Sequence, residues 1–386
     1  MGSSATNARQ TGGDRHHADR DDGGHHNDQM TDVAGRLHEY EQWLRRRMPL
    51  LANDLAVKHK RMAKDPFLFL RGSFFHWAET WPTLCPELAQ APTVLGVGDL
   101  HIENFGTWRD TQGRLVWGVN DFDEATYLPY TNDLVRLCTS ALLAISEFGV
   151  TVSQKRACEA VLQGYRHSLE AGGEPIVLAE RHRWLRNIAE TQLADESEYW
   201  ERLLKLESVK RSISPALRRM LERAMPRDSQ QLCIVHRIGG LASLGRQRFA
   251  AIASWRGGLV AREAKPLTES CWTWHKQTNR TEIRYMKVVD QAVRAQDPFL
   301  HLHGHWLVRR LAPDCSRIDL QLLPKKRDID NLLEDMGWET ANIHLSTASQ
   351  RLAIRRDLER RKHGWLLRAA RLMAADTVRD WRSLRS

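Results

Sequence analysis

The sequence predicts a mixed α+β fold with a small β-rich part and a larger, mainly helical part. Apolar runs typical of strands occur at residues 93–97 and 114–119, and three more lie between residues 234 and 265. Segments with helical apolar spacing lie around them, including residues 37–49. With 386 residues, 42% of them hydrophobic, the chain is long enough to bury a core in two lobes.

Composition limits the classes of protein to consider. Residues 1–30 are rich in Gly, Asp, His and Ser, so we expect a disordered tail. The net charge of +9 favours anionic ligands in general and does not by itself indicate nucleic acid, which we do not expect as a partner. Six scattered cysteines, no signal peptide and no apolar stretch of about 18 residues predict a cytoplasmic protein without a membrane span.

Two polar turns that follow predicted strands form the most informative pattern. Residues 93–97 predict a buried strand, and the glycine after it allows a turn that places Asp99 just past the strand end. Residues 114–119 predict a second strand. We expect a hairpin that brings Asp121 beside Asp99 and Asn104.

These three side chains have the types and the order of a phosphoryl-transfer site. Asp99 would accept the proton of an attacking hydroxyl, while Asn104 and Asp121 would hold metal ions that neutralise phosphates. Mg²⁺ prefers oxygen ligands and keeps several waters, so one amide, one carboxylate and substrate phosphates suit it. The alternative is structural: a Gly-Asp turn with an Asn can cap a loop, and residues 121–124 can form a solvated loop end.

The pattern resembles the catalytic and metal-binding loops of aminoglycoside phosphotransferases and other kinase-like enzymes, His-Gly-Asp-x-His-x-x-Asn followed by Ile-Asp-Phe. More closely, four separated motifs resemble the uncharacterised bacterial family catalogued as domain of unknown function 2252. These motifs are residues 67–72, 98–106, 120–124 and 132–137. The resemblance implies a two-lobed, protein-kinase-like fold that uses ATP and Mg²⁺.

The resemblance also implies roles for individual residues. Asp99 corresponds to the catalytic base, and Asn104 and Asp121 correspond to metal ligands. His101 would orient the catalytic loop, or else serve only as a structural hydrogen-bonding group. Asp123 would add a metal or substrate contact, or else be an ordinary solvated acid.

Three further positions flank this loop. Arg71 would bind an anionic acceptor or a phosphate, or form a buried salt bridge. Asp133 would support the catalytic loop, or act only as a carboxylate at the start of the helix at residues 134–148. Val97 stands where phosphotransferases usually have His, so one supporting hydrogen bond is absent or replaced.

A second pattern predicts a nucleotide-binding hairpin. Residues 234–253 indicate a strand, a glycine-rich turn and a second strand, and backbone N–H groups of such a turn can cover phosphates. The candidate turn residues are Gly239, Gly240, Ser243 and Gly245. Ala242 replaces the middle glycine of the kinase pattern, and a surface hairpin flanked by basic residues is the alternative.

The next predicted strand supplies a cation for the phosphates, as a lysine on the third strand does in kinases. Alignment with the resembling family puts Arg262 at the lysine position, and Lys265 follows three residues later. Strand alternation places these two side chains on opposite faces, so only one of them points at the phosphates.

The catalytic loop precedes the glycine-rich loop, which is the reverse of the order in ordinary kinases and predicts a circular permutation. We therefore expect a large-lobe part at residues 31–228 with a helical insert at 154–225, a nucleotide lobe at 229–323, and C-terminal helices at 324–386 that complete the large lobe. The helix that normally precedes the catalytic loop would be residues 330–344.

Two other patterns carry weaker expectations. The segment 351–385 predicts a basic pair of helices, whose charged face is either solvated or binds an anionic surface. Its core-facing residues are predicted to be Leu358, Trp365, Leu366, Ala370 and Leu372. The alternation His301-x-His303-x-His305 resembles a metal-binding strand face, although no carboxylate or cysteine lies at ligand spacing.

Three functions remain open at this stage. The first is a phosphotransferase that uses ATP and Mg²⁺ on a small-molecule hydroxyl. The second is a pseudokinase that binds nucleotide or a partner without chemistry, which Ala242 and Arg262 favour. The third is a metallophosphoesterase, suggested by the spacing of Asp99 and His101, but the later ligand blocks of that class are absent.

Overall fold

The computed structural model describes residues 33–178, 180, 182–192, 195–209, 213–276, 282–315 and 326–385, so the predicted N-terminal tail lies outside the described residues. The fold is mixed α+β, as the sequence predicts. The helices are α1 (Val33–Arg45), α2 (Ala52–Met62), α3 (Pro66–Gly72), α4 (Phe74–Leu84), α5 (Pro86–Ala89), α6 (Tyr130–Phe148), α7 (Gln154–Ala171), α8 (Arg183–Gln192), α9 (Glu196–Leu204), α10 (Pro215–Ala224), α11 (Cys271–His275), α12 (Tyr285–Gln291), α13 (Lys326–His344), α14 (Arg351–Arg360) and α15 (Trp365–Arg385), with the short 3-10 helices η1 (Ile102–Asn104) and η3 (Leu345–Gln350). The strands are β1 (Thr93–Gly96), β2 (Phe105–Arg109), β3 (Leu115–Val119), β4 (Thr126–Pro129), β5 (Ile176–Val177), β6 (Gln230–His236), β7 (Phe249–Trp255), β8 (Gly258–Pro266), β9 (His301–His303) and β10 (Trp306–Leu311).

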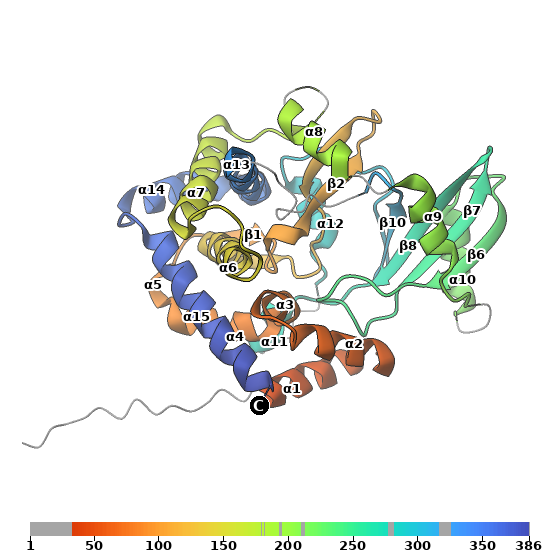
Figure 1. Cartoon of the computed structure of the whole chain (residues 1–386), viewed down its shortest axis with the longest axis horizontal. Helices are drawn as coiled ribbons and strands as arrows, with labels where there is room; N and C mark the ends of the chain where they lie inside the picture. Colours follow the sequence, from red (N-terminus) through yellow and green to blue (C-terminus); the bar gives the residue numbers. More distant parts are fainter. Residues whose placement is uncertain are drawn as a thin grey trace, which may run out of the picture. The chain divides into compact units, whose positions relative to one another are not determined.

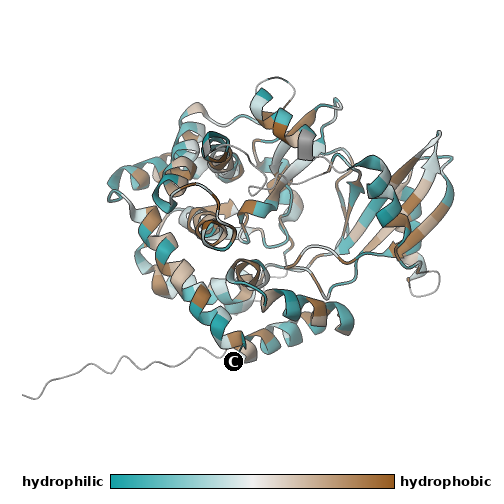
Figure 2. Ribbon diagram, viewed as in Figure 1, coloured by the Kyte–Doolittle hydropathy of each residue, from teal (hydrophilic) through white to brown (hydrophobic). Residues whose placement is uncertain are grey.

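Helix α6 lies at the centre of the helical part. All of its residues from Tyr130 to Ala144 are buried, and much of its ribbon has the hydrophobic colour in Figure 2. Helices α7, α13 and α15 lie around it in Figure 1. Helices α7 and α13 approach closely because Gly164 lies at their contact, where a Cβ would be 1.8 Å from the backbone oxygen of Glu334.

The polar turns of the site lie on two small sheets. Strands β2 and β3 form an antiparallel hairpin, with β5 on the other edge of β3, whereas β1 pairs with β4. The predicted hairpin between residues 93–97 and 114–119 is therefore wrong, although both strands exist. The tight turn after β2 joins neighbouring segments, and the five-residue strand Phe105–Arg109 gave too short a pattern to be recognised beforehand.

A five-stranded antiparallel sheet with the order β6-β7-β8-β10-β9 forms the second part. Helix α10 packs Leu217 and Leu221 on one face of the sheet, and helix α9 packs Leu203 on the other. The boundary predicted at residues 228/229 assigned both helices to the large lobe. In the structure their apolar side chains pack on the two faces of the sheet, and the boundary itself stays a prediction.

The C-terminal helices pack on the helical core. Leu358, Trp365, Leu366 and Ala370 are buried as predicted, but Leu372 is 46% exposed. An α-helix advances about 100° per residue, so Leu372 lies about 160° around α15 from Ala370 and points away from the core.

Candidate functional site

The turn after β1 is held in place by hydrogen bonds to Asp133, which lies in the first turn of α6. Gly98 has a φ of +81°, and a Cβ there would lie 2.5 Å from the backbone oxygen of Glu124. The backbone N–H groups of Val97 and Gly98 donate to Asp133 at 2.7 and 3.0 Å. His344 at the end of α13 also bonds Asp133, at 3.0 Å. Asp133 thus supports the loop that carries Asp99, and the valine backbone takes part in this support.

Asp99 forms a buried ion pair that the sequence did not predict. Nε of Arg136, on α6, donates to Oδ1 of Asp99 at 3.0 Å, and Nη2 of Arg136 donates to the same oxygen. Arg136 has no exposed surface, donates to the carbonyl of Leu70 and stacks against Phe74 and Trp77. Burial raises the pKa of Asp99 above its ordinary value, although the charge of Arg136 opposes the rise.

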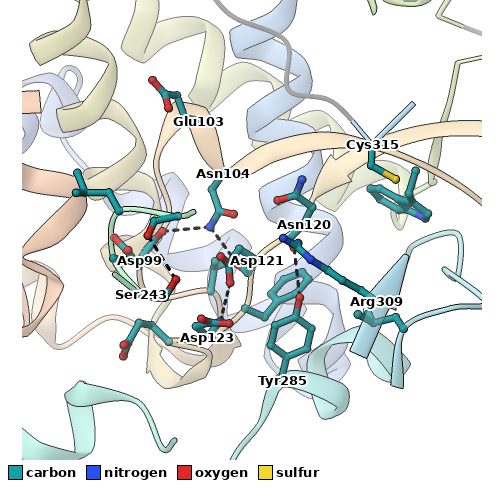
Figure 3. A pocket seen from close by; sticks show the side chains of 18 of the residues that line it. Asp99, Glu103, Asn104, Asn120, Asp121, Asp123, Ser243, Tyr285, Arg309 and Cys315 are labelled. Carbon is teal, nitrogen blue, oxygen red and sulfur yellow. Dashed lines mark hydrogen bonds between the residues drawn. The ribbon is translucent and has the colours of Figure 1, made fainter. Parts of the chain in front are cut away.

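Asn104 joins the two polar turns. Its Nδ2 donates to the backbone oxygen of Asp99 at 3.2 Å and to that of Asp121 at 3.1 Å. Its Oδ1 is buried and has no hydrogen-bond partner among the described residues. Figure 3 shows Asn104, Asp121 and Asp123 gathered in the cavity with Asp99 beside them. An unsatisfied buried oxygen next to carboxylates is a vacant acceptor for a donor or a cation.

Lys265, on β8, bridges the two carboxylates of the second turn. Its Nζ lies 3.0 Å from Oδ1 of Asp121 and 2.6 Å from Oδ1 of Asp123. Burial opposes the charge of Asp121, but Lys265 outweighs it and holds the pKa of Asp121 well below its usual value. Burial and the neighbouring charge of Asp121 raise the pKa of Asp123 to about 6. The two carboxylates therefore take up protons at different pH values, although both contact the same ammonium group.

Glu263, two residues before Lys265 on β8, anchors three arginines beside the cavity. It has no exposed surface; Oε1 accepts from Arg237 and from Arg248 (3.2 Å), and Oε2 accepts from Arg309 at 2.7 Å. Burial opposes the charge of Glu263, but these arginines and Lys265 hold its pKa well below the usual range. One carboxylate thus orients cations of the loop and of β10 toward the same space.

The glycine-rich loop between β6 and β7 meets the cavity at some of its predicted residues. Gly240 and Ser243 line it, and Oγ of Ser243 accepts from Arg248 at 2.6 Å. Gly239 lies next to the guanidinium of Arg237. The carbonyl of Gly245 accepts from the backbone of the α1–α2 segment instead.

The cavity places the other predicted residues as follows. His101 lines it and accepts the backbone N–H of Glu103 on Nδ1 at 3.2 Å. Arg71 lines it and pairs with Glu103 at 2.8 Å. Arg262 does not reach it: its side chain lies on the opposite face of β8 and stacks on Phe299, 4.3 Å from the ring centroid. Of the two candidate cations, only Lys265 faces the acidic turns.

Arg294 is a cavity residue that sequence reasoning missed. Its guanidinium lies 4.6 Å from the ring centroid of Trp108 and 5.0 Å from that of Phe122. Its Nε and Nη1 are buried without a partner among the described residues. Burial lowers the pKa of Arg294, opposed by the charge of Glu339. A single arginine in an irregular segment gave no pattern that could have revealed it.

The oxygen donors of the site can supply only part of the coordination of a divalent cation, and a bound ligand would have to supply the rest. Among the described residues, no three His, Cys, Asp or Glu side chains form a ready metal site. Asp121, Asp123 and the unsatisfied Oδ1 of Asn104 supply oxygen donors at one place, which suits Mg²⁺ if phosphates and waters complete its coordination.

The fold and the site together define a mixed α+β protein in which an acidic pair of turns faces a basic sheet across a cavity of about 210 Å³. Residues 50–232 of the chain match the family model described as "Uncharacterized protein conserved in bacteria (DUF2252)". The matched segment includes the acidic turns and ends before the glycine-rich loop and Lys265. No curated protein matches the chain, and no solved structure does. None of the helices in the described residues is both long and apolar enough to cross a membrane.

Proposed function

We propose that this protein is an ATP- and Mg²⁺-dependent phosphotransferase that acts on a hydroxyl group of a small molecule. The observation that carries the proposal is that Asp99, Asn104 and Asp121 line one cavity, and that Lys265, from a distant strand, contacts Asp121 there. A carboxylate near the acceptor, oxygen ligands for a cation and a lysine for phosphates are the parts that phosphoryl transfer needs.

We further propose a kinase-like fold with circularly permuted order. In support, the lysine lies on the third of three consecutive antiparallel strands, β6, β7 and β8, and the glycine-rich loop joins the first two. The end of α13 and the segment after it run beside β1. The backbone N–H of Leu95 donates to Oγ1 of Thr347, and the backbone oxygen of Leu95 accepts from Oγ of Ser346. This is the place that a helix preceding the catalytic loop would take after permutation.

Each residue has a defined task in this proposal. Asp99 would take the proton of the acceptor hydroxyl on Oδ2, because Arg136 already occupies Oδ1. Its raised pKa makes it a stronger base than an ordinary aspartate. Asn104 and Asp121, with Asp123, would hold Mg²⁺, which when bound neutralises phosphate charge. Lys265 would stabilise the negative charge of the transferred group.

The test compares nucleotide binding and phosphate transfer in the wild type, Asp99→Asn and Asp121→Asn. We expect Asp99→Asn to abolish transfer and to retain Mg²⁺-dependent ATP binding, whereas Asp121→Asn weakens binding of the metal–nucleotide complex. Asp290→Asn, an exposed change on α12, is the matched control and should behave as wild type. Normal transfer in either site variant would refute the assigned roles, provided that all variants melt alike.

The second candidate is a pseudokinase that binds nucleotide without transfer. Two observations favour it: the glycine-rich loop has Ala242 at its middle position, and Asp99 is tied to the buried Arg136. Metal-dependent ATP binding in the wild type, without phosphate transfer to any hydroxyl acceptor or to water, would support this function over the first.

A further inference from the structure

A second cavity, of about 680 Å³, lies on the face of the five-stranded sheet that α10 covers. We call it the outer groove. Its basic residues come from α10, β8 and β9, and Phe299 forms part of its wall; the basic residues are Arg219, Arg223, Arg262, His301 and His303. No carboxylate belongs to its lining among the residues that the structure describes. The outer groove thus differs from the proposed catalytic cavity, whose lining contains both carboxylates and arginines.

Arg262 is the most informative residue of the outer groove. It is 6% exposed, and its guanidinium stacks on Phe299 and donates to the carbonyl of Ala261 at 3.0 Å. No carboxylate within the described ranges forms an ion pair with it. A guanidinium has five N–H donors, and a buried cation is costly unless an anion compensates it. Asp297 acts on Arg262 only at longer range, so a bound anion can provide the direct ion pair that its remaining donors lack among the described residues.

The other basic side chains of the outer groove also have no ion-pair partner among the described carboxylates. Arg219 and Arg223 are one helical turn apart on α10 and are exposed, and no described carboxylate pairs with either. His301 and His303 project from the same face of β9, with ring centroids 6.3 Å apart. The sequence pattern of alternating histidines suggested a metal, but the neighbouring guanidiniums repel a metal cation and attract an anion.

We propose that the outer groove binds a phosphate-bearing small molecule. Planar guanidiniums form paired hydrogen bonds with phosphate oxygens, and three arginines converge here from two elements. The half-buried ring of Phe299 and the side chains of Met220 and Val308 give the rest of such a ligand an apolar contact. This site is separate from the proposed catalytic cavity, because Arg262 and Lys265 point to opposite faces of β8.

The test is arginine modification by phenylglyoxal, followed peptide by peptide with mass spectrometry on the full-length protein. The probes are inorganic phosphate, pyrophosphate and AMP, each compared with sodium chloride of equal ionic strength. At a probe concentration of twice its Kd, mass action should slow modification of Arg219 and Arg223 about threefold. Arg356 and Arg360, an exposed pair with the same spacing on α14, should react at an unchanged rate. This readout is specific to the groove, so phosphate binding in the catalytic cavity does not affect it.

Each outcome decides the proposal. Protection of Arg219 and Arg223 by any of the three phosphates, without protection of the α14 pair, supports the proposal. Stronger protection by AMP than by inorganic phosphate would indicate that the base of the nucleotide contacts Phe299. In the variant Arg219→Gln, which changes an exposed position, the phosphate probes should protect Arg223 less from phenylglyoxal. Modification rates that match those in chloride, or equal protection of both arginine pairs, would overturn it.

Discussion

Replacing Glu263 by Gln tests whether one buried carboxylate organises the basic side of the site. The substitution keeps the shape of the side chain and removes its charge, which leaves Arg237, Arg248 and Arg309 around a neutral amide. Glu263 has no exposed surface, and removing one partner of a buried ion pair costs about 3–5 kcal/mol because the remaining charge loses its compensation. We expect a loss of that size in the free energy of unfolding.

The assay is urea unfolding of wild type, Glu263→Gln and Arg237→Gln. Arg237 is 30% exposed, so its removal should cost at most about 1 kcal/mol, because water replaces much of what the glutamate loses. The two variants thus separate the carboxylate from a single one of its partners. A cost below about 1 kcal/mol for Glu263→Gln would show that the arginines do not depend on this carboxylate. A cost for Arg237→Gln that exceeds the cost for Glu263→Gln would show the same.

Three further expectations follow from other parts of the structure. Burial raises the pKa of Glu339 to about 7, so the native state binds more protons than the unfolded chain between about pH 4.5 and 7, and the free energy of unfolding falls with rising pH in that window. Glu339→Gln should remove up to about 3 kcal/mol of this fall, measured by urea unfolding at several pH values. An unchanged dependence on pH would contradict this expectation. Arg294→Met should weaken binding of anionic ligands in the catalytic cavity, measured by calorimetry, and should change the free energy of unfolding by only about 1 kcal/mol, because Nε and Nη1 have no hydrogen-bond partner among the described residues and the loss is limited to the cation–π contacts with Trp108 and Phe122. Gly164→Ala should destabilise by about 3 kcal/mol, since its Cβ would meet the backbone of Glu334. Gly258→Ala, with nothing within 4 Å of the added Cβ, should change the free energy of unfolding by less than about 1 kcal/mol. Similar unfolding of the two variants would refute the close helix contact.

The elements that could be predicted are those whose signal is local. A run of apolar residues at 93–97 followed by Gly-Asp gave a buried strand and a turn, and the structure has both. The pairing of these strands could not be predicted, because it depends on competition between segments that a single sequence does not rank. The same holds for α9 and α10: their amphipathic patterns predicted helices but not which surface they cover.

The site divides along the same line. The spacing of Asp99, Asn104 and Asp121 predicted that they meet, and the structure brings them together. Choosing between Arg262 and Lys265 required the orientation of the strand relative to the helical part, which only the fold supplies. The position of Arg136 is a weak local signal of its ion pair with Asp99, since a charged residue inside an apolar helix needs a buried partner.

The contact of Lys265 with Asp121 and Asp123 has a consequence for how the cavity can accept ligands. Two carboxylates two residues apart repel each other unless a cation lies between them, and Lys265 provides that cation. A divalent ion held by the same oxygens would take over this neutralising role and would repel the ammonium at such short range. Lys265 would then need a new counter-charge, and the phosphates of a nucleotide bound with the metal supply one. On the proposed function, metal and nucleotide should therefore bind together more tightly than either binds alone, because each supplies the charge that the other displaces.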